Sequence, residues 1–456
     1  MSFWEGGGVT TFLFVSMLLC ASGLVRRLSS TWARLGIPGC ILAGVIGLVF
    51  GPGALGFLPL ERDVLEGVVY HGLALTFIAI GLQKPPESAS TPDALSMGLG
   101  ISVMAVLQGL IGILLVLGIG ALQGQALHPG FGLLLPLGYN QGPGQALSMG
   151  NAWEASGLAE GGQVGLIIAA AGFACSILIG IPLIAFGRRR GYFKELAAEE
   201  AAGEDRSEDK LPPAEPGTLE QLTTHVVAIA VVYLLAYGVL HLLSSGHEDR
   251  PKLVSMLWGF HFLVALGISL VARKVWSRLP AAPLSNALLG RLANLVVDFV
   301  TCCALAAVQV SVLGESWLLV LSITVAGAVA TSFGVLWLAS RGFSRDRFQH
   351  AVLWFGASTG TLPMGLALLR LIDPGLRSAA PSSATLGSVF ALVFSAPLLL
   401  VVMPYPIAQW PEGHPTAGYA TAGILVAYLL ALLLFWASRG GLRTVSARTL
   451  WAPPGD

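Results

Sequence analysis

Long apolar runs of about 20 residues recur along the whole chain, and they limit the folds that it can adopt. A helix needs roughly 20 apolar residues to cross a bilayer, and such runs occupy most of the 456 residues. Only 11% of the residues are charged, whereas about 25% are charged in soluble proteins. Backbone groups in hydrocarbon must be bonded within their own segment, so the runs predict helices. We therefore expect an all-α polytopic membrane protein.

About 11 of these runs are long enough to span a bilayer. The expected spans are 8–25, 36–56, 65–83, 94–121, 162–186, 223–244, 253–272, 290–313, 317–340, 383–405 and 418–437. The fifth and sixth runs flank the stretch 187–222, which is rich in Glu, Ala, Asp and Pro. Such a composition buries too little apolar surface to fold. We predict that this stretch is a flexible acidic cytoplasmic linker.

Two segments, 130–152 and 346–371, interrupt the apolar runs with glycine, proline and small polar residues. Each carries a G-x-x-x-G motif, beginning at Gly138 and Gly356, and a proline follows shortly after it. In hydrocarbon, irregular backbone persists only where protein or a polar cavity covers it. We predict two re-entrant broken hairpins that face each other across one site. The alternative is that the small residues only allow close helix packing.

The distribution of positive charge supports this topology. The chain has 25 Lys and Arg residues. With the N-terminus outside and both hairpins re-entrant, all of them face the cytoplasm except Arg62, Arg250 and Lys252. This asymmetry follows the positive-inside rule. If either hairpin crossed the membrane once, every later segment would change side and the asymmetry would disappear. The charges thus predict 11 spans with the N-terminus outside and the C-terminus inside.

In this topology the halves of the chain are inverted repeats, because the first five spans begin outside and the next five begin inside. The first repeat is 1–186 and the second is 223–410. The remaining stretch, 411–456, adds one transmembrane helix and a cytoplasmic tail.

Inverted repeats with discontinuous helices are typical of secondary transporters. The N-terminus of a broken helix presents free N–H groups and a positive dipole end, which suit an anion. Unwound carbonyls suit a hard cation such as Na⁺. The candidate substrate-binding residues are Asn140, Gln141, Gly142, Gln145, Ser358, Thr359, Gly360 and Thr361. The candidate Na⁺ ligands are Tyr139, Ser148, Asn151 and Asp298.

Two charged residues have alternative interpretations. Asp298 is the only acidic residue well inside a span, where an isolated charge is costly. It either ligates Na⁺ or carries a proton, or it pairs near the interface with Arg291. Arg370, at the end of the second hairpin, either meets a substrate carboxylate or anchors the chain beside Asp373.

The segments GYNQGPGQALSMGNAWEASG, GQVGLIIAAAGF and GASTGTLPMGLALLRLIDP resemble the paired signature regions of the bacterial sodium–glutamate symporter (ESS) family. The resemblance extends over the first ten spans. It implies Na⁺-coupled symport of glutamate or a related small organic anion across the bacterial inner membrane. It also implies a dimerising scaffold and a mobile domain that moves as an elevator. The extra C-terminal helix, the linker and the first hairpin, which lacks a G-G-H-G-T-G-type pattern, depart from the family.

Two other functions stay open. The stretch IPGCILAGVIGLVFGPGALG resembles the second helix of cation/proton antiporters, and a membrane sensor could bind a ligand without transporting it. No H-E-x-x-H motif and no phosphate-binding loop of the G-x-x-x-x-G-K-[ST] type occurs in the sequence, so we expect no enzyme activity. We expect no cofactor besides Na⁺ and no nucleic-acid partner.

Overall fold

The computed structural model describes residues 7–29, 37–84, 92–193, 220–247, 249–278, 284–412 and 414–442. All regular elements in these ranges are helices, and no strand occurs among them. Ten of the helices are long and apolar enough to cross a membrane. The prediction of an all-α, multi-pass membrane protein is therefore confirmed.

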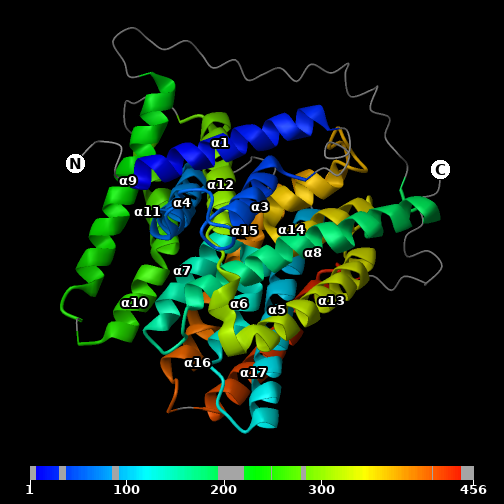
Figure 1. Cartoon of the computed structure of the whole chain (residues 1–456). Coiled ribbons are helices and arrows are strands. Elements are labelled where there is room, and N and C mark those ends of the chain that lie inside the picture. Colours follow the sequence, from blue (N-terminus) through cyan, green and yellow to red (C-terminus); the bar gives the residue numbers. More distant parts are fainter. Residues whose placement is uncertain are drawn as a thin grey trace.

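The helices follow one another in the order shown by colour in Figure 1. The first half contains α1 (Gly7–Leu28), α3 (Gly39–Phe50), α4 (Arg62–Leu82), α5 (Pro92–Gln123), α6 (Gly130–Pro136), η1 (Leu137–Gln141), α7 (Pro143–Glu154) and α8 (Gly161–Arg190). The second half contains α9 (Gln221–Ser244), α10 (Pro251–Gly259), α11 (His261–Trp276), α12 (Asn286–Ala306), η3 (Val310–Ser316), α13 (Trp317–Gly342), α14 (Arg347–Leu369), α15 (Ala379–Pro397), η4 (Leu398–Val402), α16 (Pro404–Ala408) and α17 (Thr416–Ser438).

Local sequence explains several helix ends. The Glu220 side chain accepts a hydrogen bond from the N–H of Thr223 and caps α9, and Ser285 caps α12 in the same way through Leu288. Such caps satisfy N–H groups that have no partner within the helix. At the other end of a helix, Gly191 adopts a left-handed conformation that stops α8, as C-terminal glycines commonly do.

Two of the expected spans differ in shape from the prediction. Helix α3 has only 12 residues where we expected a span over 36–56, because the Gly51-Pro52-Gly53 sequence follows it and proline cannot continue a helix. Helices α10 and α11 replace the expected span 253–272 and are bent by 53° at their junction. Counting this bent pair as one span gives up to 11 candidate spans by length and composition, and this number includes α14, whose backbone is broken at Gly360 and Thr361.

The expected linker 187–222 lies mostly outside the described residues. Helix α8 continues to Arg190, four residues into that stretch, and residues 194–219 are not described. In the expected C-terminal tail, residues 443–456 also lie outside the described part.

The helices pack in two groups. The α4 group comprises α1, α3, α4, α9, α11 and α12, and its cores are built around α4 and α12. The α5 group comprises α5, the segment from α6 to α8, and α13 to α17, and it shares one large hydrophobic core. Helix α10 packs on α7 and contributes Met256 to the core of the α5 group. Figure 1 shows α9 and α11 on the side of the molecule away from α13 and α17.

Contacts inside the α4 group occur in matched pairs. Helix α1 packs on α3 as α9 packs on α11, and α3 packs on α12 as α11 packs on α4. Helices α4 and α12 also pack directly on each other. The helices at corresponding places in the two halves of the chain therefore have corresponding neighbours.

Candidate functional site

Helix α14 is not a single straight helix but doubles back on itself. In a continuous helix, Gly356 and Gly365 would be about 13 Å apart. Instead, a methyl group on Gly356 would lie 2.7 Å from the Cα atom of Gly365. The reversal occurs at Gly360 and Thr361, whose backbone leaves the helical region, with Thr361 at φ 70°. Glycine at both contact positions allows the two arms to touch. We call α14 the second hairpin.

The segment α6–η1–α7 also turns back, and we call it the first hairpin. Its α6 and α7 arms contact each other, which a straight helix would not allow. The turn consists of the π-helical η1 followed by Gly142 at φ 100°, a conformation that only glycine adopts readily. The ends of the hairpin lie together, because a methyl group on Gly130 would be 2.9 Å from Cδ2 of Leu158.

The second hairpin also begins and ends on one side. Asp346, which precedes α14, accepts a hydrogen bond through Oδ2 from the N–H of Ala379 at 2.8 Å, and Ala379 begins α15. Each hairpin therefore enters and leaves the helix bundle at one place.

The tips of the two hairpins meet. A methyl group on Gly142 would lie 2.5 Å from Cγ2 of Thr361, so these two turns are in contact. Each returning arm begins at this place, one with Pro143 and the other just before Pro363. Proline suits the first turn of a helix, where its missing N–H has no partner in any case. The positive ends of two helix arms are thus brought to one location.

Helix α8 crosses both hairpins at Gly172. A methyl group at this position would lie 2.3 Å from the carbonyl oxygen of Thr359 and 2.9 Å from Cδ1 of Tyr139. One turn further along, Ser176 Oγ lies 2.6 Å from Thr359 Oγ1. The glycine allows α8 to support the backbone of the second hairpin and the aromatic ring of the first.

The structure places the candidate substrate-binding residues at or beside the tips. The Asn140 side chain is half-buried and donates through Nδ2 to the carbonyl of Ile101 at 3.2 Å, and Gln141 is also half-buried. Gln145 is buried, and its Oε1 has no protein partner. Thr359 Oγ1 donates to the carbonyl of Phe355 at 2.8 Å.

The four candidate Na⁺ ligands have separate surroundings. Tyr139 donates its hydroxyl to the carbonyl of Thr324 at 2.8 Å, whereas Ser148 donates to the carbonyl of Gly259 at 2.8 Å. Asn151 is exposed near the far end of α7. Within the described ranges, the printed contacts of these side chains do not converge on one point.

Asp298 is exposed on α12 and forms a side-chain hydrogen bond with Cys40 of α3. In the part of the chain that the structure describes, no ion pair joins it to Arg291. Cys40 belongs to a hydrophobic cluster that also contains Phe173 of α8 and Met364 of the second hairpin.

The expected contact between Arg370 and Asp373 is also not formed among the described residues. Arg370 is exposed, while the buried Asp373 accepts backbone hydrogen bonds from Arg377 at 3.0 Å and Ser378 at 2.8 Å. A carboxylate can satisfy the N–H groups that precede a helix, and here Asp373 does so for the turn before α15.

Two polar residues near the second hairpin escaped the sequence analysis. Gln108 lies at the middle of α5, and Thr331 lies at the middle of α13; both are fully buried. Gln108 Nε2 donates to Thr331 Oγ1 at 2.9 Å and to the carbonyl of Ser358 at 3.0 Å. The signal for Gln108 was its position as a single amide within the apolar sequence SVMAVLQGLIGILLV.

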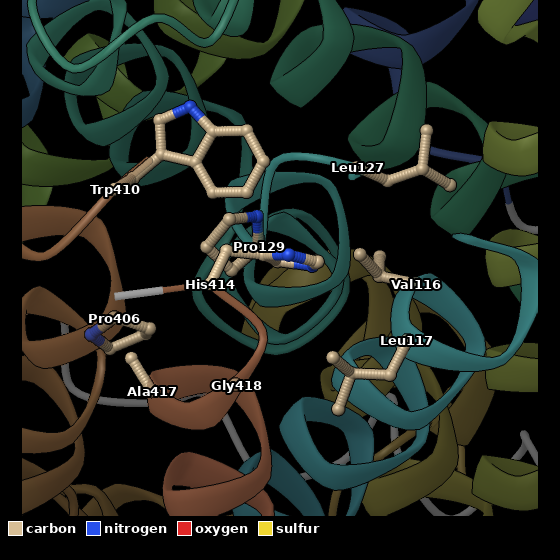
Figure 2. A pocket seen from close by; sticks show the side chains of 9 residues that line it. All are labelled: Val116, Leu117, Leu127, Pro129, Pro406, Trp410, His414, Ala417 and Gly418. Atoms are coloured by element: carbon tan, nitrogen blue, oxygen red, sulfur yellow. The ribbon is translucent and has the colours of Figure 1, made fainter. Parts of the chain in front are cut away.

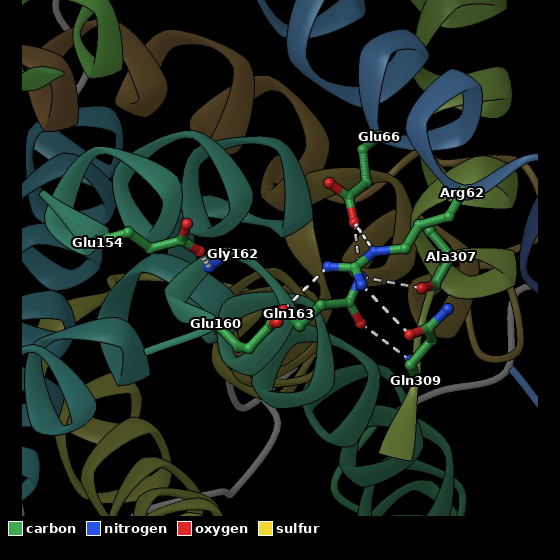
Figure 3. A network of polar contacts seen from close by, with 8 residues as sticks. All are labelled: Arg62, Glu66, Glu154, Glu160, Gly162, Gln163, Ala307 and Gln309. Carbon is green, nitrogen blue, oxygen red and sulfur yellow. Dashed lines mark hydrogen bonds and ion pairs between the residues drawn. The ribbon is translucent and has the colours of Figure 1, made fainter. Parts of the chain in front are cut away.

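A polar network joins the two helix groups near the base of the first hairpin. Figure 3 shows Arg62 between Glu66, Glu160 and Gln309. The guanidinium of Arg62 lies 2.7 Å from Glu66 Oε1 and 3.0 Å from Glu160 Oε2. Gln163 extends the network, because its Nε2 donates to Glu66 at 2.7 Å. The network ties α4 to the first turn of α8.

A small apolar pocket lies apart from the hairpin tips. Figure 2 shows Trp410 and His414 on one side of it and Val116 and Leu117 on the other. Because its lining has few polar groups, the pocket has no obvious means of recognising an anion. We therefore place the candidate site at the hairpin tips. No protein-family model matches the chain, and no curated protein matches it either.

Proposed function

We propose that the protein is a Na⁺-coupled secondary transporter that carries glutamate or a related small organic anion. One observation carries this proposal: two helical hairpins, both broken by non-helical backbone, meet at Gly142 and Thr361 inside a bundle of apolar helices. Irregular backbone at such a place needs a polar purpose, and broken helices that face each other at the midplane bind solutes in secondary transporters.

The proposed topology consists of two inverted five-helix repeats, each with a re-entrant hairpin, and the extra helix α17. Its support comes from the matched helix contacts in the α4 group and from the return of each hairpin to its side of entry. The strong asymmetry of Lys and Arg in the sequence gives independent support.

The two tips would hold the anion through helix N-termini and neutral side chains. The returning arms begin at Pro143 and near Pro363, and their first N–H groups have no partners within the helix. Asn140, Gln141 and Gln145 add amide groups beside them. Neutral groups can exchange their bonds with water during a transport cycle at less cost than buried charges.

We further propose that the α5 group moves relative to the α4 group, which would form the scaffold of a homodimer in a bacterial inner membrane. The large core of the α5 group and the core between α4, α9, α11 and α12 support this division. Two smaller clusters contain residues of both groups and would form the surface along which they move. The Arg62 network crosses the boundary between them. The side chains of its ion pairs, Arg62, Glu66 and Glu160, are partly exposed, and ion pairs of this kind can be broken at small cost.

The cation/proton antiporter is the second candidate, and one contact favours it. Asp298 is hydrogen-bonded to Cys40, which lies in the segment that resembles an antiporter helix. An acidic residue inside a membrane span is a functional candidate by default. Under this alternative Asp298 carries the proton and the hairpin tips bind no organic anion.

Uptake of labelled glutamate into proteoliposomes distinguishes the two functions. We expect uptake that requires an inward Na⁺ gradient, and at least a tenfold loss in the Asn140→Ala and Thr359→Val variants, since each removes a polar group at the tips. Thr421→Val is the matched control, because that buried hydroxyl bonds only its own helix, at the carbonyl of Ala417. Uptake driven by a pH gradient and indifferent to Na⁺ would contradict the proposal.

A further inference from the structure

Gln108 has one half of its amide bonded to protein and the other half free. Both hydrogens of its Nε2 are used, one by Thr331 Oγ1 at 2.9 Å and one by the carbonyl of Ser358 at 3.0 Å. The Ser358 carbonyl can only accept, so the NH₂ group must point toward it. Oε1 consequently points elsewhere, and it has no protein partner although the side chain is fully buried.

Ser358 supplies a second buried oxygen that has no protein partner. Its side chain is 1% exposed and its Oγ has no protein partner. Buried polar atoms are almost always bonded, because desolvation without a partner is costly. Here two buried atoms without a partner belong to residues that are joined by a hydrogen bond, from Gln108 Nε2 to the Ser358 carbonyl.

The local chemistry favours a cation over an anion. Gln108 Oε1 is an acceptor and has no proton to donate. Ser358 is in the last turn of the outgoing arm of α14, just before the break at Gly360. The final carbonyls of a helix lack intrahelical partners and form its negative end. Hard cations are bound by oxygen atoms of this kind, including carbonyls, amides and hydroxyls.

We propose that Gln108 Oε1 and Ser358 Oγ, together with carbonyls at the end of the outgoing arm of the second hairpin, bind an alkali cation, Na⁺. The proposal rests on the proposed function, since it locates the coupling ion of that transporter. It places the ion between α5 and the second hairpin. Tyr139, Ser148 and Asp298 are not among its ligands. Thr331 is a positioning residue, because it receives the Gln108 amide and thereby directs Oε1 away from itself.

A purely structural role makes a different prediction for Ser358. Gln108 could serve only as a tether between α5, α13 and the second hairpin. In that case, removing the Ser358 hydroxyl would break no hydrogen bond, because the tether uses the Ser358 backbone carbonyl. Loss of an unpartnered buried hydroxyl would then leave the protein unchanged or slightly more stable.

The test is thermal unfolding of the purified full-length chain in detergent, in NaCl and in choline chloride at equal ionic strength. A cation that binds only the folded protein raises the unfolding temperature as its concentration rises. We expect Ser358→Ala to unfold like the wild type in choline chloride. For the same stabilisation, Ser358→Ala should need at least about ten times the Na⁺ concentration of the wild type, since a bond to a charged group is lost.

Ser102→Ala is the matched control, because Ser102 is a buried serine of α5 whose hydroxyl contacts Ser395 Oγ at 3.0 Å. This variant should lose stability in both salts and keep the Na⁺ response of the wild type. Gln108→Met should lose the Na⁺ response and also some stability, since it removes both the free oxygen and the tether.

The proposal is overturned if Na⁺ does not stabilise the wild type, or if Ser358→Ala keeps the wild-type Na⁺ response. These results can be separated from failure of the proposed function. If the wild type takes up glutamate with Na⁺ but Ser358→Ala and Gln108→Met respond to Na⁺ like the wild type, the proposed function stands and only this cation site is wrong.

Discussion

The two hairpins fold in the same way, but the polar side chains at their turns differ in whether they have hydrogen-bond partners in the protein. In the first hairpin, the Tyr139 hydroxyl is bonded to the carbonyl of Thr324, and the Asn140 amide is bonded to the carbonyl of Ile101. In the second hairpin, the Ser358 hydroxyl and its neighbour Gln108 Oε1 have no protein partner. We infer that the protein holds Tyr139 and Asn140 in the turn of the first hairpin, where an oxygen without a protein partner, Gln145 Oε1, lies only in the returning arm. The turn of the second hairpin instead leaves oxygen atoms free for a solute.

The two turns also differ in backbone strain. The first places glycine at its extreme position, Gly142, so the conformation costs little. The second places the β-branched Thr361 at φ 70°, which is a genuine outlier for such a residue. Strain of this kind costs on the order of 1–3 kcal/mol and is often found at functional sites. Of the two turns, we therefore infer that the strained turn of the second hairpin is the one shaped more by solute binding.

The largest expected effect comes from the contact between the tips. Gly142→Ala combines a left-handed φ of 100° with a Cβ atom 2.5 Å from Thr361 Cγ2. Strain and overpacking together should oppose the present turn by about 4 kcal/mol. Glutamate uptake should then fall by about a thousandfold. The measurement is initial uptake into proteoliposomes at equal protein content.

Two further variants sharpen this result. Gly118→Ala, on α5, places its methyl group in open space and should transport normally. Adding Thr361→Ser to Gly142→Ala removes the methyl group at the contact and should restore part of the activity. Normal uptake by Gly142→Ala alone would show that the tips need not touch.

The next largest effect concerns the base of the first hairpin. His128 is buried and accepts a hydrogen bond through Nδ1 from the N–H of Gly130, the first residue of α6. Burial lowers the pKa of His128 from 6.5 to about 4, and the nearby Lys252 acts in the same direction. The folded protein therefore holds the neutral imidazole.

Because the pKa is lower in the folded state, the unfolded chain binds the extra proton first. The stability from His128 is fully present above pH 6.5 and is lost as the pH falls through about 4, by about 3 kcal/mol in total. Thermal unfolding between pH 7 and pH 4 measures this loss. His128→Asn can accept the same hydrogen bond through Oδ1 without titrating, so it should flatten the pH dependence; an unchanged profile would contradict the assignment.

Sequence reasoning predicted the two breaks in the helices because their chemistry is local. Glycine, proline and amides inside an apolar run mark a break such as that before Pro143, whatever the surrounding helices are. It did not find Gln108, because nothing near this residue in the sequence shows that Thr331 and Ser358 contact it. That contact joins α5, α13 and α14 across more than 200 residues.

Other side chains have partners that the sequence did not indicate. Asp373 was expected beside Arg370, its neighbour in the sequence, but its carboxylate caps the turn before α15. The side chains of Tyr139 and Ser148 were grouped as ion ligands because they lie in one segment. The structure gives their hydroxyls separate carbonyl partners.

A smaller effect tests whether the turn of the first hairpin is held by the protein. Tyr139→Phe removes the hydrogen bond to the carbonyl of Thr324, which should lower the unfolding free energy by about 1 kcal/mol. The Na⁺ concentration that gives half-maximal uptake should not change. A marked increase in that concentration would make Tyr139 an ion ligand and would remove the contrast between the hairpins.

The smallest effect is expected where the first hairpin meets the α4 group. Arg62→Gln breaks ion pairs whose members are partly exposed, with 32% of the Arg62 side chain and 50% of the Glu160 side chain accessible. We expect less than about 1 kcal/mol of lost stability, which decreases further in high salt. Unfolding temperatures at low and high ionic strength measure it. A loss of several kcal/mol would make this network a fixed joint rather than a separable contact.

Accessibility of the tips from both sides of the membrane tests the central claim most directly. The experiment places a single cysteine at the half-buried Gln141, after replacement of the five native cysteines. The variant is labelled in right-side-out and inside-out vesicles with a membrane-impermeant maleimide. The account predicts labelling from both sides, with Na⁺ and glutamate shifting the balance between them. Labelling from one side only, under every condition, would contradict an alternately exposed site.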